Sequence, residues 1–344
     1  MAIPPSSAVP VANANAGAGG GAGVALVLNA GSSSLKASLR DAAGDRLWQD
    51  QQAWDSREGH RAMETLLERW LVPVIAAADP VPTLVAHRIV HGGGDFSRPT
   101  RLTPAVLRQL EALVPLAPLH NGPALQAIAW LQGWLEGRPG ANGAAIPQWA
   151  CFDTGFHASL PEAAFTYALP ADWRAQGLRR YGFHGLNHQH VGETVARLHP
   201  GARRVISCHL GAGCSLCAIT IAAAGAARSI DTTMGFTPLE GLVMASRSGS
   251  VDPGLLLHLL RQGISAEELD RALNQASGLR GLSELSGDMR ELRAAASAGH
   301  VGAALAIAVF RHRLLQGIGA MAASLGGVDV IALTGGIGEH DDAL

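Results

Sequence analysis

Lysine is nearly missing from this 344-residue sequence, although basic residues are not. Lys and Arg together number 26, and Lys36 is the one lysine. It comes directly after Gly31-Ser32-Ser33-Ser34-Leu35. A lysine ammonium is a compact point charge on a flexible stem, which a planar guanidinium does not imitate. A single lysine could stand at this position by chance. Because Lys36 lies beside a loop suited to binding anions, we interpret it as functional.

Cysteine and excess charge are also scarce. The chain has four cysteines, at 151, 208, 214 and 217, too few for a disulfide framework, so we expect a reducing compartment. Acidic residues number 28 and the net charge is −2, which argues against a nucleic-acid partner.

No apolar run is long enough to cross a bilayer, so no membrane association is expected. The longest, residues 301–310, is followed by charged and histidine residues and predicts a buried helix. No basic residue precedes Lys36, so a secretory signal is not expected and we predict a cytoplasmic protein.

The apolar pattern predicts an α/β protein of two domains. Residues 1–22 are uncharged and rich in Ala and Gly, which is typical of a disordered extension. The domains are predicted at 23–150 and 151–344. Expected strands are 24–29, 35–39, 83–90, 149–152, 204–209, 216–221 and 328–333, and expected helices are 104–116, 187–198, 253–262, 266–275 and 301–324. Pro115, Pro118 and Pro123 are expected to break the chain.

A short internal similarity suggests a duplicated fold. Residues 30–37 resemble residues 212–218 with a one-residue gap, and each segment occupies the turn of a predicted strand–turn–strand. This pattern favours two related halves with a site between them, with a chance match as the alternative.

Three glycine turns are candidate phosphate sites. In the first, Gly31 lets the backbone approach a ligand, Ser32 and Ser34 offer hydroxyls, and Lys36 neutralises charge. Asn29 can reach a metal ion or its water. The turn is not a Walker loop, because no glycine directly precedes the lysine; a serine-rich hairpin is the alternative.

The second turn is His209-Leu210-Gly211-Ala212-Gly213, and the third is Gly335-Gly336-Ile337-Gly338-Glu339. The third follows an apolar strand and begins a helix. This arrangement favours binding of a nucleotide, because a helix N-terminus attracts negative charge; the alternative is an ordinary connection between a strand and a helix. Cysteines flank the second turn. Neighbours along a strand face opposite ways, so small core residues are expected rather than a zinc site.

Polar residues also follow or end apolar segments. Arg88 ends a predicted strand, Asp153 follows another, and His184 lies in Arg180-Tyr181-Gly182-Phe183-His184-Gly185. Further examples are Arg247, Asp288 and Arg290. Each alone is more often structural, so their value lies in the set.

These motifs, in this order, resemble the acetate kinase family of the acetate and sugar kinase, Hsp70 and actin superfamily. The segments that carry the resemblance are 29–36, 87–93, 117–121, 152–157, 179–185, 208–215, 234–241, 247–253, 288–290 and 335–339.

The resemblance implies a duplicated ribonuclease H-like fold with a cleft between two domains, a homodimer, and ATP-dependent phosphorylation of acetate to acetyl phosphate with Mg²⁺ or Mn²⁺. The implied roles are catalysis by Arg88, Asp153, His184 and Arg247, binding of the acid by Arg88, Leu119, Phe183 and Pro238, and metal binding by Asn29. The implied ATP or ADP contacts are Ser32, Ser34, Lys36, His209, Leu210, Gly211, Ala212, Gly213, Asp288, Met289, Arg290, Gly336, Ile337, Gly338, Glu339 and His340.

The sequence departs from the family at several positions. Ala212 and His340 stand where Asn is usual, Cys214 replaces Ser, and Leu186-Asn187 replaces Thr-Ser. Glu339, Asp341 and Asp342 resemble the acidic first turn of a helix. The family continues for several dozen residues beyond position 344, including a Glu that helps bind Mg²⁺. One alternative to an active acetate kinase is a propionate kinase, because the sequence does not fix the size of the acid pocket. The other is a non-catalytic nucleotide-binding relative, because that segment and Asn at position 212 are missing.

Overall fold

The computed structural model describes residues 23–31, 34–54, 59–138 and 144–344, without the side chain of Leu119. The predicted extension over residues 1–22 and the predicted phosphate ligand Ser32 lie outside the described residues, as does the side chain of Leu119. The chain divides into two compact units, with the boundary between Gly155 and Phe156. Each is described by itself, as the N-terminal unit (residues 23–155) and the C-terminal unit (residues 156–344).

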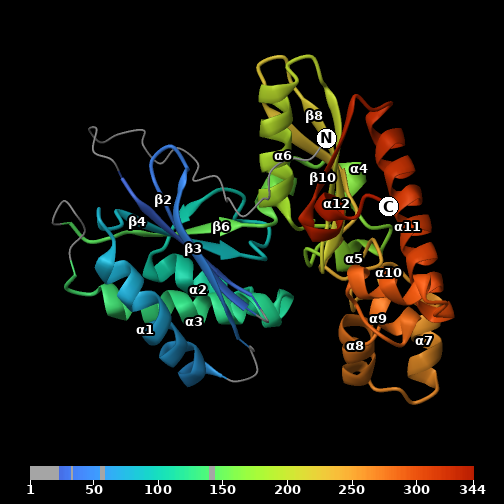
Figure 1. Ribbon diagram of the computed structural model, residues 1–344, viewed down its shortest axis with the longest axis horizontal. Helices are drawn as coiled ribbons and strands as arrows, with labels where there is room; N and C mark the ends of the chain where they lie inside the picture. The colour runs from blue at the N-terminus through green and yellow to red at the C-terminus, as the bar shows by residue number, and fades with distance from the viewer. Residues whose placement is uncertain (1–22, 32–33, 55–58, 139–143) are drawn as a thin grey trace. The chain divides into compact units, whose positions relative to one another are not determined.

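The N-terminal unit is a mixed sheet with helices against it (Figure 1). Its strands are β1 (Ala25–Ala30), β2 (Ser34–Arg40), β3 (Arg46–Ala53), β4 (Leu84–Ile89), β5 (Thr100–Arg101) and β6 (Gln148–Phe152), in the order β3-β2-β1-β4-β6-β5. Its helices are α1 (His60–Ala77), α2 (Pro104–Ala112) and α3 (Pro118–Leu135), with a 3-10 turn at Val114–Leu116.

The C-terminal unit contains a second sheet, of order β10-β7-β8-β9. Its strands are β7 (Arg204–Leu210), β8 (Cys214–Ile221), β9 (Ala227–Thr232) and β10 (Val330–Thr334). Its helices are α4 (Glu162–Phe165), α5 (Ala171–Arg174), α6 (Gly185–Leu198), α7 (Pro253–Arg261), α8 (Ala266–Gln275), α9 (Gly278–Ser283), α10 (Met289–Ser297), α11 (Val301–Leu325) and α12 (Gly335–His340).

The two sheets repeat one topology, which confirms the predicted duplication. In the N-terminal unit β1 pairs antiparallel with β2, β2 antiparallel with β3, and β1 parallel with β4. In the C-terminal unit β7, β8, β9 and β10 pair in the same senses. The two similar sequence segments lie at the equivalent β1–β2 and β7–β8 turns, and Gly31 N–H and Gly211 N–H each donate across their turn, to Ser34 O and Gly213 O.

Each sheet is buttressed by amphipathic helices. In the N-terminal unit Met63, Leu67, Leu71 and Ile75 of α1 recur at helical spacing and pack with Leu26 and Leu28 of β1. In the C-terminal unit Cys217 and Ile219 of β8 pack with Val191 and Val195 of α6. Leu216, which precedes Cys217, points to the opposite face, where Gly317 gives α11 room to approach.

Helix α3 corrects the prediction that prolines break the chain after residue 115. Pro118 is the first residue of α3, where its missing N–H costs nothing. Pro123 lies inside the helix and removes one main-chain hydrogen bond. The helix continues because Ala127, Ile128 and Leu131 are completely buried, and that packing outweighs one lost bond.

Two further predictions were wrong. Helix α11 is buried on one face only, since Val301 is 81% and Leu305 52% exposed, whereas Phe310 is buried. The acidic residues near the end do not begin a helix. Glu339 is in the last turn of α12, where its carboxylate accepts from Gly335 N–H at 2.9 Å, and Asp341 caps the C-terminus.

Candidate active site

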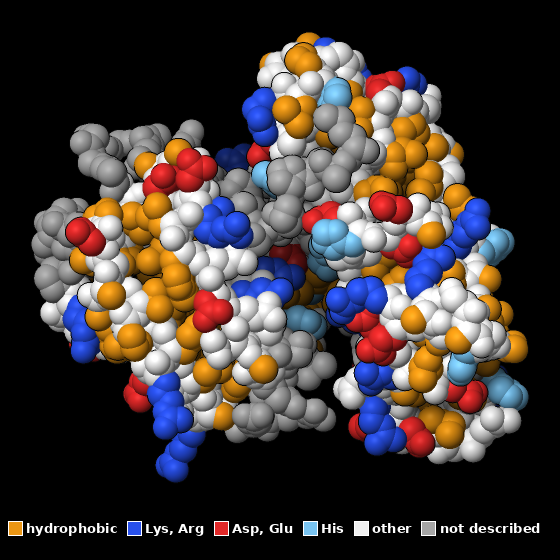
Figure 2. Space-filling view, viewed as in Figure 1, with side chains coloured by type: hydrophobic (Ala, Val, Ile, Leu, Met, Phe, Trp, Pro, Cys, Tyr) orange, Lys and Arg blue, Asp and Glu red, His pale blue; other side chains and the backbone are white. Residues whose placement is uncertain are grey.

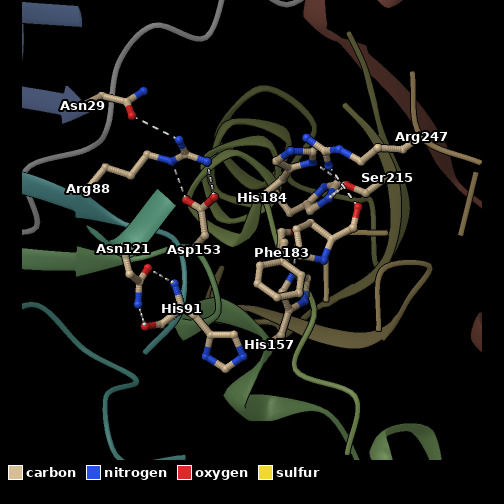
Figure 3. A network of polar contacts seen from close by, with 12 residues as sticks. Asn29, Arg88, His91, Asn121, Asp153, His157, Phe183, His184, Ser215 and Arg247 are labelled. Atoms are coloured by element: carbon tan, nitrogen blue, oxygen red, sulfur yellow. Dashed lines mark hydrogen bonds and ion pairs between the residues drawn. The ribbon is translucent and has the colours of Figure 1, made fainter. Parts of the chain in front are cut away.

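Three polar side chains lie at the carboxyl ends of the parallel strands β1, β4 and β6. Arg88 Nε donates to Asp153 Oδ1 at 2.9 Å, and Nη2 forms the second bond of a bidentate pair with Oδ2. Arg88 Nη1 donates to Asn29 Oδ1 at 3.0 Å. Figure 3 shows the guanidinium between the two oxygen-bearing groups. The pairing of β1 with β4 and of β4 with β6 brings together residues up to 124 positions apart in sequence (153 − 29).

The Arg88–Asp153 pair is held in a largely water-excluded setting. The Asp153 side chain is 2% and the Arg88 side chain 22% exposed. Burial alone would lower the pKa of Arg88, but the adjacent Asp153 carboxylate outweighs burial and raises it. The guanidinium is therefore permanently charged, and part of it remains accessible to an anion.

Lys36 lies next to Asn29 on the same face of the sheet, because the two residues are direct partners in the β1–β2 ladder. Lys36 is exposed and Ser34, at the start of β2, is half-buried. The geometry thus places a positive charge next to Asn29, and phosphate binding by Lys36 stays a prediction.

The loop after β4 is fixed by residues to which the sequence assigned no role. Asn121 of α3 accepts from His91 N–H at 3.1 Å and donates to His91 O at 2.9 Å. Thr154 Oγ1 accepts from Gly92 N–H. A Cβ on Gly92 would come within 2.5 Å of Phe96 O, so glycine is required there. Asn121 lies in one of the segments that carry the family resemblance, 117–121. Its role in holding the loop could not be predicted, because no local sequence pattern marks an asparagine that binds a distant main chain.

Among the described residues of the C-terminal unit, His184 and Glu284 are the two non-glycine residues with positive φ, and His184 is the one at the candidate site. It is the N-cap of α6 and adopts φ 56°, a left-handed conformation that non-glycine residues seldom occupy. The preceding Gly182 also has positive φ, and a Cβ there would come within 2.6 Å of the His157 ring. The turn thus determines where the imidazole of His184 lies.

His184 faces the second glycine turn. Its ring centroid lies 4.5 Å from that of His209. A Cβ on Gly213 would lie 3.4 Å from His184 Nε2 and 3.7 Å from Arg247 Nη1, so the glycine allows close approach to both. Arg247 Nη1 also donates to Pro238 O at 2.9 Å. Two imidazoles and a guanidinium around a glycine turn form a cluster of donors suited to phosphate oxygens.

A cavity of about 730 Å³ opens beside this turn within the C-terminal unit. Its volume is in the range of sites for small organic ligands. It brings together three of the four segments predicted to contact the nucleotide; the fourth, which contains Ser34 and Lys36, does not line it. The predicted residues that line it are Gly211, Ala212, Asp288, Met289, Arg290, Gly336, Ile337 and His340.

The cavity wall also contains charged residues that the sequence did not indicate. Arg280 and Arg293 line it, and Arg293 is paired with Asp341 at 2.9 Å. Asp288 caps α10 and forms an ion pair with Arg290, whose hydrogen bonds lower the pKa of Asp288 to about 2. Arginine is abundant in this chain, so neither Arg280 nor Arg293 carried a local signal.

Some predicted contacts lie away from the cavity wall. Leu210 is fully buried, Gly338 packs toward Leu333, and the Glu339 carboxylate is engaged by Gly335 N–H. Phe183, predicted to line the pocket for the acid, is 1% exposed.

All four cysteines are buried and free. Burial raises the pKa of Cys151 to about 11 and those of the other three to about 12, so all are neutral thiols at pH 7. Across the described ranges no group of three His, Cys, Asp or Glu side chains is arranged to hold a metal.

Comparison with known proteins identifies relatives across most of the chain. The model of the acetokinase family matches residues 46–343. An acetate kinase of Synechococcus sp. (strain JA-2-3B'a(2-13)) is 45% identical over 349 residues, which is 92% of this chain and 83% of that protein. The crystal structure of Porphyromonas gingivalis acetate kinase aligns with TM-score 0.78 at 35% identity, over 93% of this chain and 84% of that one. A propionate kinase from Francisella tularensis subsp. tularensis SCHU S4 aligns with TM-score 0.80 at 32% identity, over 92% and 85%.

Proposed function

Because this chain belongs to the acetokinase family, we propose that it transfers the γ-phosphoryl group of ATP to acetate, giving acetyl phosphate and ADP. In the forward reaction a carboxylate oxygen attacks phosphorus, and the bond from phosphorus to the ADP oxygen breaks. The acceptor is already an anion, so no general base is needed. Catalysis then consists of alignment and of stabilising charge on the phosphoryl oxygens.

The observation that carries this proposal is the convergence of three of the four predicted nucleotide segments on one cavity. The Gly211–Ala212 turn at its edge would hold phosphates through main-chain N–H groups. The segments at Asp288–Arg290 and Gly336–Ile337 would surround the nucleoside. His184 and Arg247, which lie close to Gly213, would donate to the transferring phosphoryl group.

In the N-terminal unit Arg88 is the group best suited to an anionic acceptor. Its two bonds to Asp153 leave it oriented and charged, and it remains partly exposed. Lys36 beside Asn29 adds a second positive charge for phosphate. These charges offset the repulsion between acetate and ATP, both of which are anions.

The oxygen donors of the same unit are of the kind that Mg²⁺ prefers. Asn29 offers an amide oxygen and Asp153 a carboxylate, both oriented by Arg88. Mg²⁺ in phosphoryl-transfer enzymes is usually held by one or two such groups together with substrate phosphates, so a larger protein cage is not required. When bound, the ion would neutralise charge on the phosphates.

Propionate is the second candidate substrate, because one aligned structure is that of a propionate kinase. Within the C-terminal unit, the residues proposed for the acid's alkyl group are Phe183 and Pro238. An extra methylene changes binding in a tight apolar pocket by only about 1–3 kcal/mol. The ratio of kcat/KM for acetate to that for propionate therefore decides between them.

We further propose a cytoplasmic homodimer. The four free, buried cysteines support a reducing compartment. Helix α11 is long and apolar enough to cross a membrane by composition alone. However, its buried residues Ala303, Ala306, Phe310, Leu314 and Met321 belong to the core of the C-terminal unit. Val301, Leu305 and Leu315 on its outer face are exposed, and Figure 2 shows apolar side chains along this helix. We propose that a second copy of the chain covers this apolar surface.

The direct test is formation of acetyl hydroxamate from ATP, Mg²⁺, acetate and hydroxylamine. ATP- and acetate-dependent product at a rate well above the enzyme-free background supports the proposal. Nucleotide binding without product would instead identify a non-catalytic relative.

A further inference from the structure

Behind His184 runs a buried chain of alternating imidazoles and hydroxyls. Ser215 Oγ lies 2.9 Å from His184 Nδ1 and 2.8 Å from His188 Nε2. His188 Nδ1 lies 2.8 Å from Ser207 Oγ. Figure 3 shows Ser215 and His184 within this network. His188, Ser207 and Ser215 are each 0% exposed, so solvent cannot replace these bonds.

The hydrogens of this chain can be placed by counting donors and acceptors. Burial, with smaller contributions from His157 and His209, lowers the pKa of His188 well below its ordinary value. Its ring is therefore neutral and carries one hydrogen, so it donates through one nitrogen and accepts through the other.

Ser207 decides which nitrogen of His188 donates. Among the described residues the hydroxyl of Ser207 has one hydrogen-bond partner, His188 Nδ1. A buried hydroxyl without an acceptor for its hydrogen is costly, so Ser207 donates to Nδ1. The hydrogen of His188 is then on Nε2, which donates to Ser215 Oγ. Ser215 in turn donates its own hydrogen to His184 Nδ1.

We infer that His188 is a positioning residue for His184: through Ser215 it holds the neutral His184 ring in the tautomer whose hydrogen is on Nε2. That nitrogen is the one beside Gly213, near Arg247. His184 thus presents an N–H donor toward the glycine turn without needing to be protonated. The tautomer itself follows from the hydrogen-bond chain alone, whereas its role in turnover rests on the proposed phosphoryl transfer.

The tautomer is tested first by ¹⁵N NMR of the histidine-labelled full chain at pH 7. The His184 resonances are identified by their loss in His184→Gln. The inference expects hydrogen on Nε2 and a bare Nδ1 in the unmodified protein. Hydrogen on Nδ1 of His184 would overturn it, whatever the kinetics show.

Ser215→Ala removes the link between the two rings. The expected result is a mixture of His184 tautomers and a kcat about tenfold or more lower, with the KM values for ATP and acetate nearly unchanged, because an aligned donor is lost rather than a binding group. The matched control is Ser229→Ala, which breaks a bond of similar burial to His157 Nδ1, 2.9 Å away, in the same unit. It should leave the His184 tautomer and kcat within about twofold of the unmodified protein.

Ser207→Ala is the alternative variant if Ser215→Ala does not fold. It removes the donor that sets the direction of the chain, so tautomer mixing is again expected. A single Nε2–H tautomer and full kcat in either folded variant would show that the chain does not position His184. If the unmodified protein makes no acetyl phosphate, the proposed function fails, while the NMR result still decides the tautomer.

Discussion

The neighbours of Arg88 keep its guanidinium charged and fix its orientation. Its bidentate bond to Asp153 uses two guanidinium nitrogens and its bond to Asn29 the third. A substrate carboxylate would therefore meet an arginine whose orientation is already set, which reduces the entropy lost on binding.

Arg88→Ala and Arg247→Ala are each expected to lower kcat/KM by at least about a hundredfold, because the first loses the charge that holds the acceptor carboxylate and the second loses charge stabilisation of the phosphoryl group. Arg88→Lys should recover only part of this loss, since an ammonium keeps the charge but cannot form the fork with Asp153. The measurement is initial rate in the hydroxamate assay. ADP affinity serves as the control for Arg88→Ala, because the cavity lies in the C-terminal unit. Near-normal turnover would remove the residue concerned from its proposed role.

His87 should make stability depend on pH. It is 2% exposed and hydrogen-bonded to Gln148, and burial lowers its pKa from 6.5 to about 4. Between those values the unfolded ring binds a proton and the folded ring does not. The contribution of His87 is therefore complete above pH 6.5 and is lost as the pH falls toward about 4.

The free energy of unfolding of the unmodified chain, minus that of His87→Gln, should shrink by about 2 kcal/mol from pH 7 to pH 5. Tryptophan fluorescence in urea is a suitable probe, because every tryptophan except Trp173 lies in the N-terminal unit. His60→Gln, in the same unit at a side chain that is 52% exposed, is the control and should show no such change. A pH-independent difference for His87→Gln would contradict the expectation.

At the level of elements, the loop that carries Pro238 depends on a polar clamp. Tyr167 Oη donates to Glu240 Oε2 at 2.5 Å, and Arg180 donates to Glu240 Oε1 at 2.7 Å. Arg180 Nη1 also donates to the carbonyls of Thr232, Thr233 and Met234. The clamp closes over Gly235, where a Cβ would lie 1.6 Å from Glu240 Oε2.

Gly235→Ala should therefore destabilise the chain by about 1–3 kcal/mol through overpacking. It should also weaken turnover, because Pro238 O, the acceptor for Arg247, lies on the displaced loop. Thermal melting and the hydroxamate assay measure the two effects. Gly201→Ala, where a new Cβ meets nothing within 4 Å, is the matched substitution and should be nearly neutral. Equal melting temperatures for the two variants would argue against the clamp.

For the molecule as a whole, the exposed apolar face of α11 predicts self-association. The unmodified chain should elute with a mass of twice 35.6 kDa in light scattering. Leu305→Glu places a charge on that face and should shift the protein toward monomer. Leu47→Glu, on β3, is the control because Leu47 is 54% and Leu305 52% exposed. A monomeric unmodified chain, or an unshifted Leu305→Glu variant, would refute the proposed interface.

Local sequence was sufficient for the parts of this protein that depend on neighbours along the chain. The turns at Gly31, Gly211 and Gly335 were predictable, because a glycine-rich segment between apolar strands has few other conformations. The lone Lys36 marked the first of them. The expected strands correspond to β1, β2, β4, β6, β7, β8 and β10, and the expected helices to α2, α6, α7, α8 and α11, since apolar periodicity reports which face of an element is buried. Helices α1 and α3 and strands β3 and β9 were not predicted.

The tertiary structure decided whatever depends on distant partners. The α3 helix forms around Pro123 because buried contacts outweigh one main-chain bond. Parallel pairing of β1, β4 and β6 brings Asn29, Arg88 and Asp153 together. The hydrogen-bond chain behind His184 joins α6, β7 and β8, and His188 carried no signal in a sequence with 14 histidines. A hydrogen bond acts over about 3 Å in space, and sequence separation does not report that distance.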